Sequence, residues 1–244
     1  MFDKFKDECG VFGIFGHAEA ANLTYLGLYA LQHRGQESAG IAAADGTRIR
    51  ASRAMGYVND AFGSDTLAGL TGHLAAGHVR YSTAGESRLA NAQPIVIDSA
   101  HGQLALGHNG NLINAGELRD ALVGEGAIFQ TSTDSEVVVH LFARSKAPNV
   151  EAAIIDAIGQ VRGAYSFVLM TKDRIIGVRD PHGFRPLSPA VEYRTCPTAD
   201  VPASFARTDS SNPSATYPIV LCMVRRSPSV AAMPALSWPR CWSA

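Results

Sequence analysis

The stretch ECGVFGIFG, at residues 8–16, combines a single cysteine with an apolar run that is spaced by glycines. Apolar residues alternate there with glycine, a pattern that predicts a short buried strand, and Cys9 stands at its start. If the chain is cut after Glu8, the α-amino group of Cys9 lies a few bonds from its own sulfur. That amine has a pKa of about 7.7–8.0 and a thiol one of about 8.5, so the neutral amine can accept the thiol proton. One residue then supplies both a nucleophile and its base.

The alternative for Cys9 is structural, because a single cysteine beside an apolar strand is most often a small buried hydrophobe. The three other cysteines, Cys196, Cys222 and Cys241, lie near the end of the chain. No two cysteines form a Cys-x-x-Cys pair, and no histidine follows His182. This spacing argues against a zinc site and against a disulfide scaffold.

Charge and length exclude several classes of protein. The chain has 244 residues, with 21 basic and 22 acidic side chains and a net charge of −1. This balance gives no sign of a surface for nucleic acid or for an anionic membrane. The opening MFDKFKDE is charged and too short for a secretory signal, and no later apolar run reaches the length of a membrane span. We therefore expect a cytoplasmic protein.

Composition changes sharply near residue 188. All 23 glycines occur at or before Gly183, whereas eight of the 12 prolines follow Ser188. Residues 189–244 show no sustained helical or strand period, which is unusual for a packed domain. We therefore expect an irregular tail at 189–244, either unrelated to the preceding domain or read out of frame.

The pattern of residues 9–188 predicts an α+β domain with antiparallel pairing. Asp45-Gly46 is a strong hairpin signal, and Lys172-Asp173 stands between two further apolar runs. Thr133 and Glu136 match the capping box of a helix. The expected strands are 40–44, 47–50, 74–81, 94–97, 103–108, 164–170 and 174–178, the expected helices are 18–32, 115–123, 137–142 and 150–160, and residues 57–70 are expected to be irregular with short helical turns. Strands and helices are grouped, unlike the regular alternation of a parallel fold.

Four further motifs follow Cys9 in a fixed order: LQHRGQESAG (31–40), GHVRYSTAG (77–85), GHNGNL (107–112) and TSTDSE (131–136). Together they resemble the glutaminase domain of the amidophosphoribosyltransferase family, over residues 1 to about 188. The resemblance implies a four-layer αββα sandwich of the N-terminal nucleophile hydrolase type. It also implies hydrolysis of glutamine to glutamate and ammonia through a cysteinyl thioester, as part of the first step of purine biosynthesis.

The resemblance assigns a role to Cys9 and to three positions around it. Cys9 corresponds to the N-terminal nucleophile, and residues 1–8 correspond to a propeptide that the protein removes autocatalytically. Arg80 corresponds to the arginine that holds the α-carboxylate of glutamine, and Thr83 and Ala84 would line the same pocket. The structural alternative for Arg80 is an ordinary surface ion pair.

The resemblance also assigns the groups that stabilise the reaction. Asn109 and Gly110 correspond to the oxyanion hole, although Asn-Gly is equally the commonest hairpin turn. Asp134 corresponds to the carboxylate that binds the ammonium of glutamine, with a helix-terminus acid as the alternative. Arg34 corresponds to an arginine that orders the loop over the site, with a helix C-terminal cation as the alternative. His33, His78 and His108 are read as structural, because an amine-activated thiol needs no imidazole base.

The second domain of the family is not evident in the chain, because no acidic pair with a Gly-Thr phosphate loop follows Pro186. Phosphoribosyl pyrophosphate, Mg²⁺, the iron–sulfur cluster of some members and homo-oligomer formation are therefore expectations for the full-length family alone. No cofactor and no metal site are expected in this chain. Two alternatives stay open: the glutaminase domain of another class II amidotransferase such as glucosamine-6-phosphate synthase, or an inactive fragment that misfolds.

Overall fold

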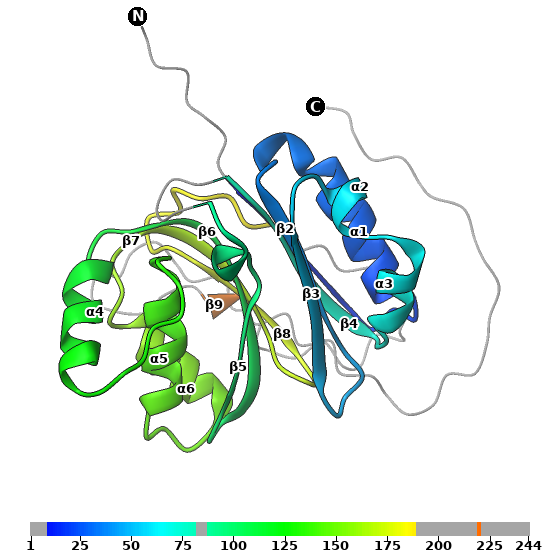
Figure 1. Ribbon diagram of the computed structural model, residues 1–244. Helices are drawn as coiled ribbons and strands as arrows, with labels where there is room; N and C mark the ends of the chain where they lie inside the picture. Colours follow the sequence, from blue (N-terminus) through cyan, green and yellow to red (C-terminus); the bar gives the residue numbers. More distant parts are fainter. Residues whose placement is uncertain (1–8, 82–86, 189–218, 221–244) are drawn as a thin grey trace, which may run out of the picture.

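The computed structural model describes residues 9–81, 87–188 and 219–220, and these ranges form two sheets stacked face to face (Figure 1). The first sheet has the strand order β1-β4-β2-β3, and the second β5-β6-β7-β8-β9. The strands are β1 (Gly10–Phe15), β2 (Ser38–Ala44), β3 (Ile49–Met55), β4 (Leu74–Arg80), β5 (Ile95–Ser99), β6 (Gly102–Leu112), β7 (Gly163–Met170), β8 (Ile175–Arg179) and β9 (Ile219–Val220). Neighbouring strands pair antiparallel throughout these ranges, which confirms the predicted α+β class.

Helices cover the outer face of each sheet, so the predicted order helix, sheet, sheet, helix is confirmed (Figure 1). The first sheet carries α1 (Ala20–Ala30), α2 (Val58–Ala61) and α3 (Ser64–Gly69), and the second carries α4 (Ala115–Gly124), α5 (Glu136–Arg144) and α6 (Val150–Ile158). Two short 3₁₀ turns, Gln32–Arg34 and Leu89–Asn91, lie in the connections. Within the described ranges, none of these helices has both the length and the apolar character needed to cross a membrane.

The sequence of strand β2 lacks the alternation of polar and apolar residues that is typical of a half-exposed strand. All of its residues are buried. Ala42 and Ala44 pack between the two sheets with Val168 and Met170. Ile41, on the opposite face of β2, belongs to the apolar cluster that includes Leu28 of α1. Because both faces of the strand are covered, apolar residues are favoured at every position.

Two hydrogen bonds join the sheets and fix their relative direction. At one end, the backbone N–H of Ile49 donates to Gln103 Oε1 at 2.8 Å. At the other end, His78 Nε2 of β4 donates to the carbonyl oxygen of His108 in β6 at 2.8 Å. The end of β4 therefore lies at the same end of the sandwich as the end of β6. Burial lowers the pKa of His78 to about 3, despite the hydrogen bond to the His108 carbonyl, so His78 is neutral at physiological pH.

Both predicted hairpins are present, but the expected start of the second strand at residue 47 is wrong, because β3 begins at Ile49 and residues 45–48 form the loop. Strands β2 and β3 pair around Asp45-Gly46, where Gly46 has a φ of +90° that favours glycine. The Asp45 carboxylate accepts the backbone N–H groups of Thr47 and Arg48 at 2.9 and 3.1 Å, which closes the turn. Strands β7 and β8 pair around Lys172-Asp173. The short helices α2 and α3 occupy the stretch 57–70, as predicted.

The capping box predicted at Thr133 and Glu136 is wrong. Helix α5 begins at Glu136, and the residue before it, Ser135, makes no side-chain cap. The Glu136 carboxylate instead accepts the backbone N–H groups of Gln130 and Thr131, each at 2.8 Å. An acid that stabilises the preceding loop is therefore not available for the reciprocal bond of a capping box.

The expected end of the strand at residue 108 is also wrong. Strand β6 continues to Leu112, with Asn109 opposite Ser166 and Gly110 opposite Tyr165 of β7. Asn109-Gly110 therefore lies within a strand and does not form a hairpin turn. Pairing with a distant strand overrides the local turn preference at this site.

We expect Gly77→Ala to lower the free energy of unfolding by about 1–3 kcal/mol, because overpacking strains a tight contact. A Cβ at Gly77 would lie 2.6 Å from Thr24 Cγ2 and 2.8 Å from Leu28 Cδ1 of α1. Gly116→Ala in α4 is the matched control, because its Cβ meets nothing within 4 Å and alanine favours the helix. Urea denaturation measures the free energy of unfolding of both variants. Equal stability of Gly77→Ala and Gly116→Ala would contradict the packing described.

We expect the stability of the protein to fall on acidification because of His78. The unfolded chain binds a proton at His78 near pH 6.5, whereas the folded protein does so only near pH 3, so stability is lost as the pH falls between these values. The loss attributable to His78 is about 2 kcal/mol between about pH 6.5 and about pH 4.5. Denaturation of His78→Gln, which keeps an N–H donor without a titrating ring, should show a correspondingly smaller pH dependence. His33→Gln, at an exposed histidine, is the control, and an unchanged slope in His78→Gln would refute the assignment.

Candidate active site

The candidate site lies where β6 extends beyond its neighbour β5. Strand β5 pairs with β6 only as far as Ile95 opposite Leu106. Strand β6 then continues along β7 to Leu112. Among the strands in the described ranges, none pairs with the other edge of residues 107–112. The backbone groups on that edge therefore need partners of another kind.

Side chains from three other segments supply these partners. Gln93 Oε1 accepts the backbone N–H of His108 at 2.8 Å, and His78 donates to the His108 carbonyl. Asp134 Oδ2 accepts the backbone N–H of Leu112 at 2.8 Å. Because alternate residues of a strand face the same edge, the Gly110 N–H points to this edge, between the two that are held. The Tyr165 carbonyl opposite Gly110 accepts from Asp180 N on the far side at 2.9 Å, in keeping with this pattern.

Asn109 and Gly110 have features that set them apart from an ordinary strand. Gly110 has a φ of +146°, and a Cβ there would lie 2.1 Å from the Ala164 carbonyl oxygen, so this backbone requires glycine. The side chain of Asn109 is buried, and its Oδ1 has no hydrogen-bond partner in the described part of the chain. This oxygen is a buried acceptor that a donor group of a ligand can use.

The backbone of Cys9 is held in a fixed position at the start of β1. It is buried and adopts a φ of +53°, which is uncommon for a residue with a side chain. Its carbonyl oxygen accepts from Arg34 Nε at 2.8 Å, and its thiol donates to the Tyr81 carbonyl at 3.4 Å. Arg34 therefore contacts the backbone of the predicted nucleophile and is not merely a cation at the end of a helix.

Arg80 ends β4 and is buried, which excludes the surface ion pair considered from the sequence. Its Nη1 pairs with the Glu37 carboxylate. The backbone N–H of Glu37 also donates to the Arg80 carbonyl at 3.1 Å. A buried guanidinium of this kind has a fixed orientation, and it is suited to hold a carboxylate.

Asp134 lies two residues before α5, partly buried beside the end of β6. Burial alone would raise its pKa, but the hydrogen bond with His108, together with the bonds from Leu112 N and Ser135, lowers it below its ordinary value. His108 Nδ1 lies 3.4 Å from Asp134 Oδ1. Asp134 is therefore an ionised carboxylate at physiological pH, and it lies before the helix and not in its first turn.

The structure brings most of the predicted residues to one end of the sandwich. Strand β1 pairs with β4 so that Gly10 lies opposite Val79, which places Cys9 beside Arg80. The His78–His108 bond places the same end of β4 near Asn109 and Gly110. Asp134 reaches this edge through Leu112, and Arg34 through Cys9. Thr83 and Ala84, the propeptide 1–8 and nearly all of the tail 189–244 lie outside the described residues.

Three residues at this site, Glu37, Gln93 and Ser135, are not predicted from the sequence as functional candidates. Glu37 and Ser135 lie inside quoted motifs, but nothing in their spacing indicates that they contact Arg80 and Asp134. Gln93 precedes Pro94, and its only sequence signal was the expected start of a strand. Their partners are distant in sequence, so a single sequence does not reveal the contacts.

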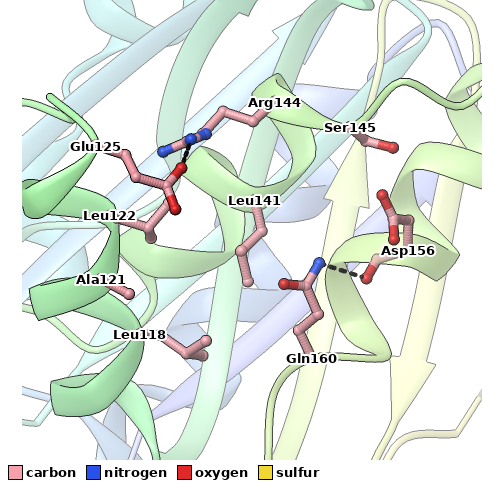
Figure 2. Close-up of a pocket in the computed structure, with 9 residues that line it drawn as sticks. All are labelled: Leu118, Ala121, Leu122, Glu125, Leu141, Arg144, Ser145, Asp156 and Gln160. Atoms are coloured by element: carbon pink, nitrogen blue, oxygen red, sulfur yellow. Dashed lines mark hydrogen bonds and ion pairs between the residues drawn. The ribbon is translucent and has the colours of Figure 1, made fainter.

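A surface pocket of about 200 Å³ lies elsewhere, between α4, α5 and α6 (Figure 2). Leu118, Leu122 and Leu141 form its apolar wall, and an ion pair of Arg144 with Glu125 stands at one side. None of the predicted site residues lines it, so it is not the candidate site. Among the described residues, no three His, Cys, Asp or Glu side chains gather in the way that a metal ion would need.

Comparison with known proteins agrees with the motifs. Residues 78–196 match the family described as "Glutamine amidotransferase domain". Amidophosphoribosyltransferase 3, chloroplastic, of Arabidopsis thaliana is 50% identical over 185 residues, which are 76% of this chain and 35% of the relative. The amidophosphoribosyltransferase of Bacillus subtilis is 48% identical over 184 residues, which are 75% of this chain and 39% of the relative.

A third relative extends further along the chain. The amidophosphoribosyltransferase of Rhizobium etli is 43% identical over 237 residues, which are 94% of this chain and 47% of the relative. This match reaches past residue 188, as does the family match that ends at residue 196. The boundary at 188 and the origin of the tail stay predictions. The chain spans less than half the length of these three relatives.

Two solved structures share the fold. The glutamine phosphoribosylpyrophosphate amidotransferase from B. subtilis, complexed with ADP and GMP, superposes with a TM-score of 0.68 at 45% identity, covering 72% of this chain and 38% of that chain. A structure described as the allosteric regulatory enzyme of purine biosynthesis gives 0.69 at 46% identity, with the same coverage. The chain therefore belongs to the glutamine amidotransferase domain of the amidophosphoribosyltransferase family, and this decides against the glucosamine-6-phosphate synthase alternative.

Proposed function

We propose that this chain hydrolyses glutamine to glutamate and ammonia, with Cys9 as the nucleophile. The observation that carries the proposal is the position of Cys9 at the end of the sandwich where Asn109, Gly110 and Arg80 also lie. Family membership supplies the reaction class, and the contacts of these residues support their individual roles.

Removal of residues 1–8 would free the α-amino group of Cys9 to act as the base. The amine takes the thiol proton, directly or through one water, and the thiolate attacks the side-chain amide carbon of glutamine. The amide nitrogen leaves as ammonia with that proton, and water then hydrolyses the thioester to release glutamate. The Arg34–Cys9 carbonyl bond supports this role, because it fixes the backbone of the nucleophile.

The oxyanion of the tetrahedral intermediate needs N–H donors aimed at one point. Gly110 suits this role, because alternation directs its N–H to the edge of β6 that no strand in the described ranges covers. Asn109 would donate from its side-chain Nδ2, because it directly precedes Gly110 in β6 and its side chain is buried. Glycine is required at position 110, because a Cβ there would lie 2.1 Å from the Ala164 carbonyl oxygen of β7.

The two charges of the amino-acid end of glutamine match two buried or partly buried groups. Arg80 would hold the α-carboxylate by a bidentate contact, and Asp134 would take the α-ammonium. Glu37 supports Arg80 in this role, because it orients the guanidinium before substrate arrives. Thr83 and Ala84 would line the same pocket.

In the whole enzyme, we propose that the ammonia passes to phosphoribosyl pyrophosphate on a second domain, in the first step of purine biosynthesis. The names of the relatives support this role, and the chain covers less than half of their length. Full transferase activity and homo-oligomer formation would therefore belong to the longer protein. The transferase domain would also hold its Mg²⁺ and any iron–sulfur cluster.

We expect a glutamine-like electrophile, a diazoketone analogue of glutamine, to label Cys9 and no other residue. Peptide mapping locates the adduct, and the intact mass should show that residues 1–8 are absent from the labelled chain. Cys9→Ala should abolish labelling and glutamine hydrolysis while the protein stays folded. Glutamine hydrolysis at the wild-type rate by Cys9→Ala, or labelling of a chain that retains residues 1–8, would refute the proposal.

We expect Asn109→Ala to lower kcat for glutamine hydrolysis by about 10²–10³-fold, as loss of one oxyanion donor does. KM should change much less, because the contact strengthens in the transition state. Asn111→Ala is the matched control, because Asn111 is the next asparagine of the same strand and is exposed. A loss of less than tenfold in Asn109→Ala would exclude this role.

A further inference from the structure

The side chain of Ser135 is the centre of a buried hydrogen-bond network beside Asp134. Ser135 is fully buried. Gln93 Nε2 donates to its oxygen at 3.1 Å, and His108 Nδ1 lies 2.8 Å from it. Ser135 Oγ lies 3.2 Å from Asp134 Oδ1. Residues from three segments thus meet at one hydroxyl.

The direction of the bond between Gln93 and Ser135 follows from one fixed donor. The backbone N–H of His108 donates to Gln93 Oε1, so the Nε2 of Gln93 is necessarily the donor to Ser135. A hydroxyl has one proton and two lone pairs. If His108 Nδ1 carries a proton, it fills the second lone pair, and the Ser135 proton goes to Asp134.

The tautomer of His108 with its proton on Nδ1 fits its surroundings. Its other nitrogen, Nε2, is buried and has no hydrogen-bond partner in the described part of the chain. A proton on Nε2 would therefore be a buried donor without an acceptor, which costs more than an unused lone pair. The ring packs against Phe167, with centroids 4.6 Å apart, so its orientation is fixed.

Both oxygens of Asp134 are consequently held. Oδ1 accepts from Ser135 and Oδ2 accepts from Leu112 N. Each carboxylate oxygen has a second lone pair, and no further hydrogen bond within the described residues uses it. A carboxylate held at both oxygens presents these lone pairs in a fixed direction.

We propose that Ser135, oriented by Gln93 and His108, is a positioning residue that aims Asp134 at the α-ammonium group and so makes the site selective for α-amino-acid amides. This inference rests on the proposed function, in which Asp134 binds that ammonium. It adds a residue that never touches the substrate, and it assigns the discrimination between glutamine and its analogue without the amino group to the Ser135 hydroxyl.

The test compares glutamine with glutaramate, which has the same amide and carboxylate but no α-amino group. Ser135→Ala should raise the KM for glutamine by about ten- to a hundredfold, the range expected for a hydrogen bond to a charged group. Its kcat should change much less, and kcat/KM for glutaramate should stay within about twofold of wild type. Ser135→Thr, which retains the hydroxyl, should recover the KM for glutamine.

Ser145→Ala is the matched control, because Ser145 follows the other end of the same helix and its hydroxyl accepts only a local bond from Ala147 N in the described structure. Ser145→Ala should leave kcat and KM unchanged for both glutamine and glutaramate. In an Asp134→Asn background, Ser135→Ala should add almost nothing, because residues that act through one another are not additive. Equal losses for glutamine and glutaramate, or full additivity with Asp134→Asn, would overturn the proposal.

Binding measurements separate this inference from the chemistry assigned to Cys9. Calorimetry with the full chain should show that Ser135→Ala weakens binding of glutamate about tenfold or more and leaves glutarate unchanged. If the wild-type chain binds glutamate but does not hydrolyse glutamine, the catalytic proposal fails while this comparison still decides the role of Ser135. Equal weakening of the two ligands, or no binding of glutamate by the wild-type chain, would overturn the inference.

Discussion

The site depends on one requirement: the polar backbone groups at the end of β6 are buried or nearly so, and no strand lies beside them within the described ranges. Buried N–H and carbonyl groups need partners, so side chains must be brought in from elsewhere. Gln93, His78 and Asp134 meet this need from a loop, from the opposite sheet and from the approach to α5. The same contacts that satisfy the backbone therefore hold together the segments that carry the candidate site.

The charged side chains at this end of the sandwich also have partners, as the backbone groups of β6 do. His78 is neutral at physiological pH because it is buried, so it can join the sheets without adding a cation beside Arg80. The guanidinium of Arg80 has Glu37 as a partner, and Asp134 has donors on both oxygens. Groups that are paired and hydrogen-bonded can be buried at modest cost, whereas isolated charges cannot. A substrate with one positive and one negative group can therefore meet a site whose own charges are already oriented.

Local signals in the sequence were sufficient for much of the fold. The turn at Asp45-Gly46 depends on a glycine conformation and on the Asp45 carboxylate, both of which are encoded within a few residues. The end of β6 was misjudged because the strand is set by pairing with β7, more than fifty residues later in the chain. The capping box failed for a similar reason, because the Glu136 carboxylate binds the loop before the helix.

The sequence predicts those residues of the candidate site that lie in a recognisable motif. It does not predict the residues whose only sign of a role is their contact in the folded structure. Cys9, Arg80, Asn109 and Gly110 lie inside motifs, and the structure brings them to one end of the sandwich. The contact of Gln93 with Ser135 joins residues 42 positions apart, and no periodicity indicates it.

The covered edge of β6 has a consequence for association between molecules. An exposed strand edge is a template for another extended chain, and it is a common starting point for aggregation. Here Gln93 and Asp134 already accept from His108 N and Leu112 N, and His78 already donates to the His108 carbonyl. A foreign strand would have to displace all three side chains before it could pair. The contacts that satisfy the backbone at the end of β6 thus also oppose strand addition along this edge.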